Sequence, residues 1–222
     1  MCIDNFLQET MIQNIKIAVL GGGGRTGKYL VTELIAKGYS VKLLLRNPEN
    51  FQIKSPLIEI IHGDAIDFVA VNSLLKNCQA VISTIGQRPG EPLVAEQATK
   101  NVLEAMSRNG INRYILLAGI NVDTPFDKKG PETINATNWM KSNFPIIQED
   151  RQKSYSLLVN SSINWTLLRV PFIDFNQAKS KMGISLYDCL GNKIDAGSIA
   201  TFLTLQLEDC TYYNKVPFIY NA

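Results

Sequence analysis

The chain has 222 residues, of which 45% are hydrophobic and 19% are charged. This composition is typical of a globular protein and excludes collagen-like repeats, coiled coil and extensive disorder. The 22 basic and 20 acidic side chains leave a net charge of +2, too small an excess to favour nucleic acid or an anionic membrane as a partner. The longest apolar run, residues 114–120, is far shorter than the roughly 20 residues of a membrane-spanning helix.

The amino terminus and the cysteines favour a soluble, cytoplasmic protein. Residues 1–10 have no basic stretch ahead of an apolar core, so we expect no signal peptide. The cysteines form no Cys-x-x-Cys pair and are typical of free thiols in a reducing compartment: Cys2, Cys78, Cys189 and Cys210. His62 is the one histidine and cannot form a histidine-based metal site alone, so we expect no metal. The expected partner is a small molecule, and the expected assembly is a monomer or a homodimer.

Short apolar runs of strand length alternate along the chain with segments of helical period. The runs predict six strands, at residues 15–20, 40–45, 57–61, 80–83, 114–118 and 165–170. The helical periods predict helices at residues 25–37, 66–76, 92–108, 148–160 and 197–208, with a short strand following at 217–220. Pro92 suits a helix start, because its missing N–H is not needed there. The stretch from Gly119 to Pro145 is rich in proline and glycine, and we predict no regular element in it.

The alternation of strands and helices predicts βαβ units and therefore a parallel sheet. Right-handed crossovers place helices on both faces of such a sheet. The expected fold class is α/β, a doubly wound parallel sheet of the Rossmann type in a single domain. We assign residues 14–222 to this dinucleotide-binding domain, with a small substrate-side region at its carboxyl end. Residues 1–13 are then an N-terminal extension.

A glycine-rich loop follows the first strand and opens the first helix. Its glycines Gly21, Gly24 and Gly27 have the spacing G-x-x-G-x-x-G. Glycines at these places allow a sharp turn, a close approach of the backbone to a pyrophosphate, and tight packing of the helix on the strand. The helix N-terminus then faces the anion with unpaired N–H groups. This placement indicates a dinucleotide site rather than a merely tight turn, and the site includes Gly21, Gly24, Arg25, Thr26 and Gly27.

The end of the second strand indicates NADP(H) rather than NAD(H). An NAD site commonly has a carboxylate there, about 20 residues past the loop, but here Arg46 ends the strand and no carboxylate precedes Glu49. The Arg46 guanidinium can bind a 2′-phosphate through charge-assisted hydrogen bonds, with help from Arg25. The alternative is that both arginines are ordinary solvated side chains.

Three further strand ends point toward the same crevice. Asp64 can accept a hydrogen bond from the adenine amino group, and it can also cap the helix that follows. Gly86 allows the backbone to run beside the cofactor, and we expect the nicotinamide near Gly119. These strand ends add the following residues to the cofactor site: Asp64, Ala65, Ser83, Thr84, Gly86, Ala118 and Gly119.

Five segments together resemble the atypical short-chain dehydrogenase/reductases: the glycine loop, Leu45-Arg46-Asn47-Pro48, Gly63-Asp64-Ala65, residues 83–86 and Trp165-Thr166-Leu167-Leu168-Arg169. Among these proteins the chain is similar to the NAD(P)H-binding NmrA-like group that includes biliverdin-IXβ/flavin reductase. The resemblance covers roughly residues 14–220. It implies a Rossmann fold, NADPH as the hydride donor, and flat conjugated substrates such as flavins or quinones.

The sequence departs from the ordinary short-chain dehydrogenases at their catalytic residues. No tyrosine is followed by a lysine four residues later, and Leu117-Ala118-Gly119 stands where those enzymes have a serine. At the position of the family's usual Lys or His this chain has Arg151, and arginine stays protonated. A conventional alcohol dehydrogenase mechanism is therefore not expected.

Two functions remain open from the sequence, and we favour the first, an enzyme, over the second. The first is NADPH-dependent hydride transfer to a flat conjugated acceptor, with the proton taken from water. The second is a redox-sensing regulator that binds the dinucleotide without turnover. A sugar-nucleotide epimerase is disfavoured because it needs Tyr-x-x-x-Lys. The candidate substrate contacts are Arg88, Phe126, Trp139, Phe144, Arg151 and Phe172, of which Arg88 and Arg151 are the catalytic candidates. Arg88 is favoured because it follows a strand that should end beside the nicotinamide, whereas each aromatic ring has ordinary loop packing as its alternative.

Overall fold

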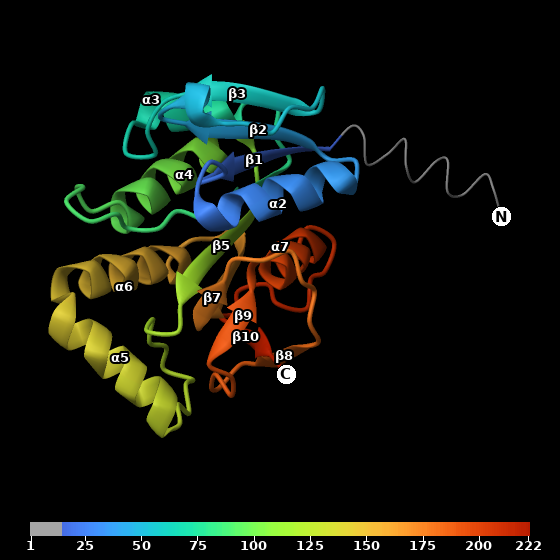
Figure 1. Ribbon diagram of the computed structural model, residues 1–222. Coiled ribbons are helices and arrows are strands. Elements are labelled where there is room, and N and C mark those ends of the chain that lie inside the picture. The colour runs from blue at the N-terminus through green and yellow to red at the C-terminus, as the bar shows by residue number, and fades with distance from the viewer. Residues whose placement is uncertain (1–14) are drawn as a thin grey trace.

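The computed structural model describes residues 15–222, with parallel strands at its centre (Figure 1). Side chains along each strand alternate between two buried faces. In β1 (Lys16–Leu20), Ile17 and Val19 enter one apolar cluster, while Ala18 and Leu20 enter the other. Burial on both faces explains why the strands form nearly continuous apolar runs in the sequence. The predicted N-terminal extension, residues 1–13, lies outside the described residues.

The main sheet has eight strands in the order β3-β2-β1-β4-β5-β6-β10-β8. All neighbours are parallel except β10 and β8, which are antiparallel. Its other strands are β2 (Ser40–Leu45), β3 (Ile58–His62), β4 (Ala80–Ser83), β5 (Arg113–Gly119), β6 (Asn164–Val170), β8 (Met182–Ser185) and β10 (Phe218–Asn221). A separate parallel pair joins β7 (Phe172–Asp174) to β9 (Lys193–Asp195). This topology confirms the expected doubly wound α/β fold.

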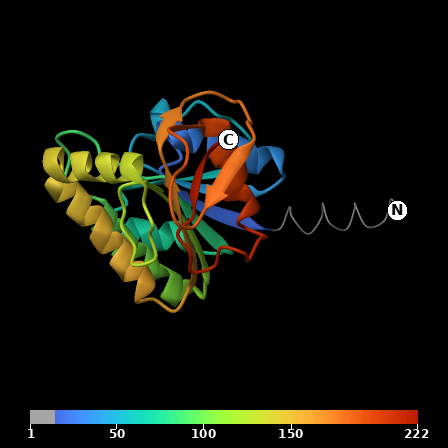
Figure 2. The same ribbon diagram turned by 90° about the horizontal axis from the view of Figure 1, so that it is seen from below.

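Helices cover both faces of the sheet, as Figures 1 and 2 show. One face carries α3 (Phe68–Leu75), α4 (Ala95–Asn109) and α6 (Pro145–Val159), and the other carries α2 (Arg25–Ala36) and α7 (Ala196–Leu205). Helix α5 (Pro131–Asn143) leans away from the sheet beside α6. A single 3-10 turn, η1 (Pro48–Asn50), follows β2. Within residues 15–222, none of the helices has the length and apolar character needed to cross a bilayer.

The structure departs from the predicted elements at three places. Helix α5 lies within the stretch predicted to be irregular, because Gly130 and Pro131 stand at its N-cap and first turn, where both residues are compatible with a helix. The third predicted helix begins at Ala95 rather than Pro92, because the Asp150 carboxylate accepts hydrogen bonds from its first two N–H groups at 2.8 and 3.0 Å. Strands β7, β8 and β9 have only three or four residues each, too few for a periodic pattern to predict.

The strand order reverses between β1 and β4, where the chain crosses from one half of the sheet to the other. Ligands of doubly wound folds bind at such a point, beyond the carboxyl ends of the strands. The loops after these two strands are in contact. The Thr84 N–H donates to the Leu20 carbonyl oxygen at 2.9 Å, and its hydroxyl donates to that of Gly21 at 3.2 Å. The fold therefore places the glycine loop at the expected binding edge.

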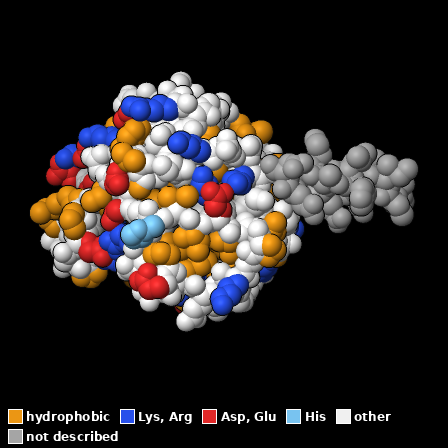
Figure 3. Space-filling model, turned by 90° about the horizontal axis from the view of Figure 1, so that it is seen from above, with side chains coloured by type: hydrophobic (Ala, Val, Ile, Leu, Met, Phe, Trp, Pro, Cys, Tyr) orange, Lys and Arg blue, Asp and Glu red, His pale blue; other side chains and the backbone are white. Residues whose placement is uncertain are grey.

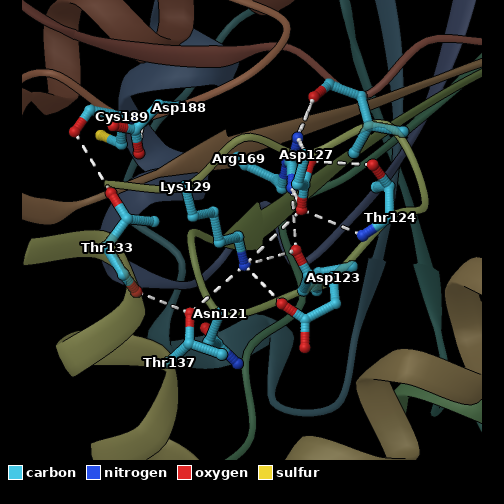
Figure 4. A network of polar contacts seen from close by, with 12 residues as sticks. Asn121, Asp123, Thr124, Asp127, Lys129, Thr133, Thr137, Arg169, Asp188 and Cys189 are labelled. Atoms are coloured by element: carbon cyan, nitrogen blue, oxygen red, sulfur yellow. Dashed lines mark hydrogen bonds and ion pairs between the residues drawn. The ribbon is translucent and has the colours of Figure 1, made fainter. Parts of the chain in front are cut away.

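Arg169 in β6 is fully buried at the centre of a polar network on the carboxyl-terminal side (Figure 4). Two of its N–H groups donate to the Asp127 carboxylate at 2.8 and 2.9 Å. The other three donate to the carbonyl oxygens of Val122 and Val216. Its guanidinium also lies over the Phe218 ring, 3.5 Å from the centroid. Because every donor has an acceptor, the buried charge ties the segment after β5 to β6 and β10.

Lys129 extends this network to α5 (Figure 4). Its ammonium donates to the Asp123 carboxylate at 2.7 Å and to the Thr137 hydroxyl at 3.2 Å, and it lies 3.7 Å from the Asp127 carboxylate. Burial lowers the pKa of Lys129, and the two carboxylates oppose that shift. Lys141 pairs with the other oxygen of Asp123 at 2.8 Å. Ionic contacts therefore hold the segment between β5 and α5 in place of regular pairing.

Candidate functional site

Two glycines of the loop after β1 occupy positions that exclude a side chain. Gly21 has φ of +80°, a conformation that L residues rarely adopt, and a Cβ there would lie 2.8 Å from the Thr84 carbonyl carbon. A Cβ on Gly27 would collide with the carbonyl oxygen of Gly21. The loop backbone therefore packs directly against the first turn of α2 and the start of the segment after β4. This close packing is what a phosphate-binding turn at the edge of the sheet requires.

The N-terminus of α2 is open to an anion. Gly24 is its N-cap residue, no side chain caps it, and the first turn contains no acidic residue. The first N–H groups of a helix have no partner within the helix, and the helix dipole places partial positive charge there. A pyrophosphate would therefore meet unpaired donors and no opposing charge. The cradle fits the diphosphate of a dinucleotide.

Arg46 follows directly after β2 and is held by a carboxylate from another loop. Its two terminal nitrogens donate to the two Glu91 oxygens at 2.8 and 2.9 Å, and Asp64 lies 3.7 Å away. The hydrogen bond to Glu91 raises the pKa of Arg46 despite partial desolvation. The His62 ring contacts the Arg46 carbonyl oxygen at 3.0 Å, and Figure 3 shows side chains of both charges next to this histidine. The arginine predicted to bind the 2′-phosphate is thus paired with the Glu91 carboxylate, and the Asp64 carboxylate lies nearby.

Other residues predicted at the adenosine end have specific contacts. The guanidinium of Arg25 lies over the Phe175 ring, 4.3 Å from its centroid. The alternative role of Asp64 as a helix cap is wrong, because Asp67 is the N-cap of α3 and accepts from the Val69 N–H at 2.8 Å. Asp64 instead accepts from the backbone N–H two residues later at 3.2 Å. Its other oxygen lies 3.7 Å from the Arg46 guanidinium, and the predicted adenine contact stays a prediction.

A pocket of about 50 Å³ lies at the ends of β4 and β5, between α4 and α6. Its polar lining comes from Ser83, Gln87, Thr99, Tyr114, Asp150, Arg151 and Ser154, and Ala118 also lines it. The Thr99 and Ser154 hydroxyls share a hydrogen bond of 2.7 Å. Burial raises the pKa of the Tyr114 hydroxyl, although hydrogen bonds with Ser83 and Thr99 oppose this shift. These hydroxyls form a neutral polar floor in the pocket, which lies where the sequence predicts the nicotinamide.

Arg151 brings a positive charge to this pocket without a partner. Among residues 15–222, no carboxylate lies within 4.0 Å of its guanidinium, and no hydrogen bond satisfies it. Burial lowers its pKa, and only the more distant charge of Asp150 opposes the shift. The Asp150 carboxylate itself is committed to the N-terminus of α4. A partly buried guanidinium that forms no ion pair or hydrogen bond is costly, so it favours an anion or a polarised oxygen in the pocket.

Gln87 adds an unpaired acceptor to the same pocket. Its amide nitrogen donates to three carbonyl oxygens of its own loop, while its Oε1 atom is buried without a donor. A ligand carrying an N–H or O–H group would satisfy that atom. The pocket therefore offers a donor group at Arg151 and an acceptor at Gln87.

The structure separates the predicted residues into two sets. Ser83, Ala118 and Arg151 line the pocket, Thr84 directly follows β4, and Gly119 is the last residue of β5. Arg88 lies outside it, exposed, with its guanidinium 3.7 Å from Glu91. The four predicted aromatic contacts are also exposed, from 43% at one ring to 83% at another: Phe126, Trp139, Phe144 and Phe172. Two of them, Trp139 and Phe144, pack edge to face with centroids 5.5 Å apart.

Several residues of the site left no signal in the sequence. No sequence motif marks Gln87, Asp150 or Glu91. Gln87 donates hydrogen bonds to its own loop backbone, whereas the two carboxylates bind groups that are far away in the sequence. Within the described part of the chain, no group of three His, Cys, Asp or Glu side chains lies close enough to hold a metal ion. The polar pocket and the glycine cradle are thus the features that the fold brings to one edge.

Comparisons with known proteins agree with this geometry. A family model described as NAD(P)H-binding matches residues 21–209. An uncharacterised chloroplastic protein of Arabidopsis thaliana is 24% identical over 171 residues, which are 72% of this chain and 60% of that protein. Cinnamoyl-CoA reductase 1 of Petunia hybrida is 23% identical over 220 residues, which are 86% of this chain and 65% of the reductase.

A solved structure has the same fold. A short-chain dehydrogenase/reductase of Veillonella parvula in complex with NADP superposes with a TM-score of 0.77 at 16% identity, covering 93% of this chain and 94% of that one. The chain spans less than two thirds of the length of the Arabidopsis and Petunia proteins.

Proposed function

The chain belongs to the NAD(P)H-binding family, as its resemblance to atypical short-chain dehydrogenases led us to expect, and from that premise we propose that it is an NADP(H)-dependent oxidoreductase. The acceptor in this proposal is a flat conjugated molecule such as a flavin, a quinone or a related carbonyl compound. The observation that carries the proposal is the combination of an uncapped helix N-terminus after β1 with an arginine directly after β2. The first suits a diphosphate, and the second suits a 2′-phosphate.

The cofactor would lie along the carboxyl ends of the strands. In this proposal the glycine loop holds the diphosphate, Arg46 binds the 2′-phosphate with Arg25 beside it, and Asp64 contacts the adenine. The remaining predicted contacts follow the strand ends toward the pocket: Thr26, Ala65, Ser83, Thr84, Gly86, Ala118 and Gly119. When bound, the dinucleotide supplies the hydride, so the chain itself needs no redox group.

On the substrate side, Arg151 is the residue that we assign to the acceptor. Its guanidinium forms no ion pair among residues 15–222 and lines the pocket at the end of β5. It can donate hydrogen bonds to an acceptor oxygen and stabilise negative charge that develops there. Since no Tyr-x-x-x-Lys pair is present, the proton in this proposal comes from water, and Gln87 orients the acceptor through its free Oε1 atom. The predicted catalytic role of Arg88 stays untested, and its side chain is not among the residues that line the pocket.

A non-catalytic regulator is the second candidate, and one observation favours it. The pocket is small, about 50 Å³, and its one phenol, Tyr114, is fully buried with its pKa raised. A dinucleotide sensor needs no room for an acceptor and no proton donor. Turnover therefore decides between the two candidates.

The first experiment measures cofactor affinity and turnover together. NADPH and NADH are titrated into wild type, Arg46→Ala and Arg108→Ala, the last being an exposed arginine of α4 that pairs with Glu104. We expect Arg46→Ala to weaken NADPH binding about tenfold to a hundredfold, since it removes charge-assisted hydrogen bonds, and to leave NADH binding within about twofold. Arg108→Ala should change neither.

The same proteins are then mixed with NADPH and a panel of flavins, quinones and aldehydes, and the absorbance of the reduced nicotinamide is followed. Loss of absorbance with an acceptor supports the reductase. Tight NADPH binding without any turnover supports the regulator. An Arg46→Ala variant that loses no NADPH affinity relative to NADH contradicts the assignment of the 2′-phosphate site.

A further inference from the structure

Arg46 already holds an anion in the geometry that a phosphate would take. Its two terminal nitrogens contact separate oxygens of Glu91 at 2.8 and 2.9 Å, a bidentate arrangement. Arginine binds carboxylate and phosphate through the same fork of N–H groups. A 2′-phosphate that uses this fork must therefore displace the Glu91 carboxylate.

The carboxylate comes from the loop between β4 and α4, which has its own internal support. The amide nitrogen of Gln87 donates to the carbonyl oxygens of Arg88, Glu91 and Pro92 at 3.1, 2.9 and 3.1 Å. These bonds fix the loop conformation, so that Glu91 extends from the loop after β4 to Arg46 at the end of β2. Because β1 lies between those two strands, the loop passes over the edge where the adenosine half of a dinucleotide is proposed to bind.

A second arginine lies near the same carboxylate. The Arg88 guanidinium is 3.7 Å from the Glu91 oxygen that also accepts from Arg46. When the carboxylate leaves Arg46, Arg88 can keep its charge balanced on the same loop. Displacement therefore exchanges one ion pair for another and leaves no carboxylate unpaired.

We propose that Glu91 is an internal competitor for the 2′-phosphate and so sets the cofactor preference of the site. Glu91 occupies Arg46 in the free protein, and a phosphorylated cofactor displaces it, while a cofactor without the 2′-phosphate leaves the pair intact. The consequence is that Glu91 weakens binding of the phosphorylated cofactor and has no such effect on NAD(H). This inference rests on the proposed function, because it assumes that Arg46 binds the 2′-phosphate.

The test uses two fragments that differ only in the phosphate in question, 2′,5′-ADP and 5′-AMP. Each is titrated calorimetrically, at one ionic strength, into wild type, Glu91→Gln and Glu91→Ala. Glu104→Gln is the matched control, since Glu104 also forms an exposed ion pair with an arginine. An exposed ion pair is a weak competitor, so we expect both Glu91 variants to bind 2′,5′-ADP roughly two- to fivefold more tightly than wild type. Binding of 5′-AMP should be unchanged in every variant, and Glu104→Gln should match wild type.

A double mutant separates this mechanism from a general effect of charge. In an Arg46→Ala background, Glu91→Gln should leave the affinity for 2′,5′-ADP unchanged, because the guanidinium for which the carboxylate and the phosphate compete is absent. If Glu91→Gln raises the affinity for 2′,5′-ADP by the same factor in that background, Glu91 acts only through the electrostatic potential around the site. That result overturns the proposal. Unchanged or weaker binding of 2′,5′-ADP by the single Glu91 variants also overturns it.

The outcome also distinguishes failure of the inference from failure of the proposed function. If wild type prefers 2′,5′-ADP over 5′-AMP and Arg46→Ala abolishes that preference, the 2′-phosphate site stands whatever Glu91 does. If wild type shows no preference between the fragments, the NADP assignment fails and the competition falls with it.

Discussion

The pocket around Arg151 and the network around Arg169 both place a guanidinium on the carboxyl-terminal side of the sheet, but in opposite states. Arg169 is fully buried and donates from all five N–H groups, two of them to Asp127. Arg151 is partly buried, and no hydrogen bond or ion pair satisfies its guanidinium within residues 15–222. Sequence alone does not distinguish these two arginines.

The difference in hydrogen bonding between Arg169 and Arg151 indicates a different role for each guanidinium. A buried cation whose donors are all used can no longer bind a ligand, so Arg169 has a structural role. A cation left without a partner beside a pocket destabilises the free protein and gains when an anion or polarised oxygen arrives. Arg151 is therefore the residue to test for function, and the partners of Arg169 are the ones to test for stability.

The largest expected effect comes from breaking the buried pair. Asp127→Ala leaves the Arg169 charge buried without its carboxylate, which costs about 3–5 kcal/mol of unfolding free energy in comparable pairs. Urea unfolding at neutral pH measures this loss. The control Glu104→Ala removes an exposed pair and should cost about 1 kcal/mol or less. If both variants unfold at the same urea concentration, Arg169 does not depend on Asp127.

The next effect concerns activity rather than folding. Arg151→Met should lower kcat about a hundredfold, since a donor to developing negative charge is lost, and should leave the affinity for NADPH within about twofold. Its unfolding free energy should equal or exceed that of wild type, because the replaced charge has no partner.

Lys153→Met on the same helix is the control for this variant, because Lys153 pairs with Glu149 on the exposed side. That control should keep wild-type turnover. A large loss of stability in Arg151→Met would show that its guanidinium has a structural partner, and normal turnover would remove Arg151 from the mechanism.

The smallest effect is a pH dependence of stability at Asp123. Burial alone would raise the pKa of this carboxyl, but hydrogen bonds and charges from Lys129 and Lys141 outweigh it and hold the pKa below its ordinary value. A carboxylate with a lowered pKa in the folded state stabilises the fold above its unfolded pKa, about 3.9. That stabilisation disappears as pH falls through the lower folded value.

Asp123→Asn is therefore expected to be less stable than wild type at pH 7, by about 1 kcal/mol or less because the side chain is partly exposed. Urea unfolding between about pH 7 and pH 3 should show the two proteins converging below about pH 4. A difference that stays constant over this range would mean that the charge of Asp123 is not what stabilises the network.

The parts of the molecule that sequence predicts well are those set by neighbouring residues. The glycine spacing from Gly21 to Gly27, the strand Ser40–Leu45 and the strand Ala80–Ser83 have the predicted positions. Each depends on local backbone conformation or on apolar alternation, which a short window of sequence contains. Helix α5 has no such local signal, because Gly130 and Pro131 favour an irregular segment by composition, although both are compatible with a helix start.

The parts that sequence does not predict depend on pairs of residues far apart in the chain. Glu91 reaches Arg46 across 45 positions, and Asp150 caps a helix that begins 55 positions earlier. No local pattern distinguishes such a carboxylate from an ordinary surface charge. This is also why Arg88 was favoured over Arg151 from sequence, while only Arg151 lines the pocket.

The doubly wound sheet and the glycine cradle can be predicted from the amino-acid sequence, because both arise from periodicity and from residues adjacent in the chain. Which charged side chains form ion pairs, and which do not, becomes visible in the folded protein alone. Pairing depends on the distance between side chains that folding brings together. In the folded protein every Arg169 donor has an acceptor, Arg46 is paired with Glu91, and Arg151 forms no ion pair within residues 15–222.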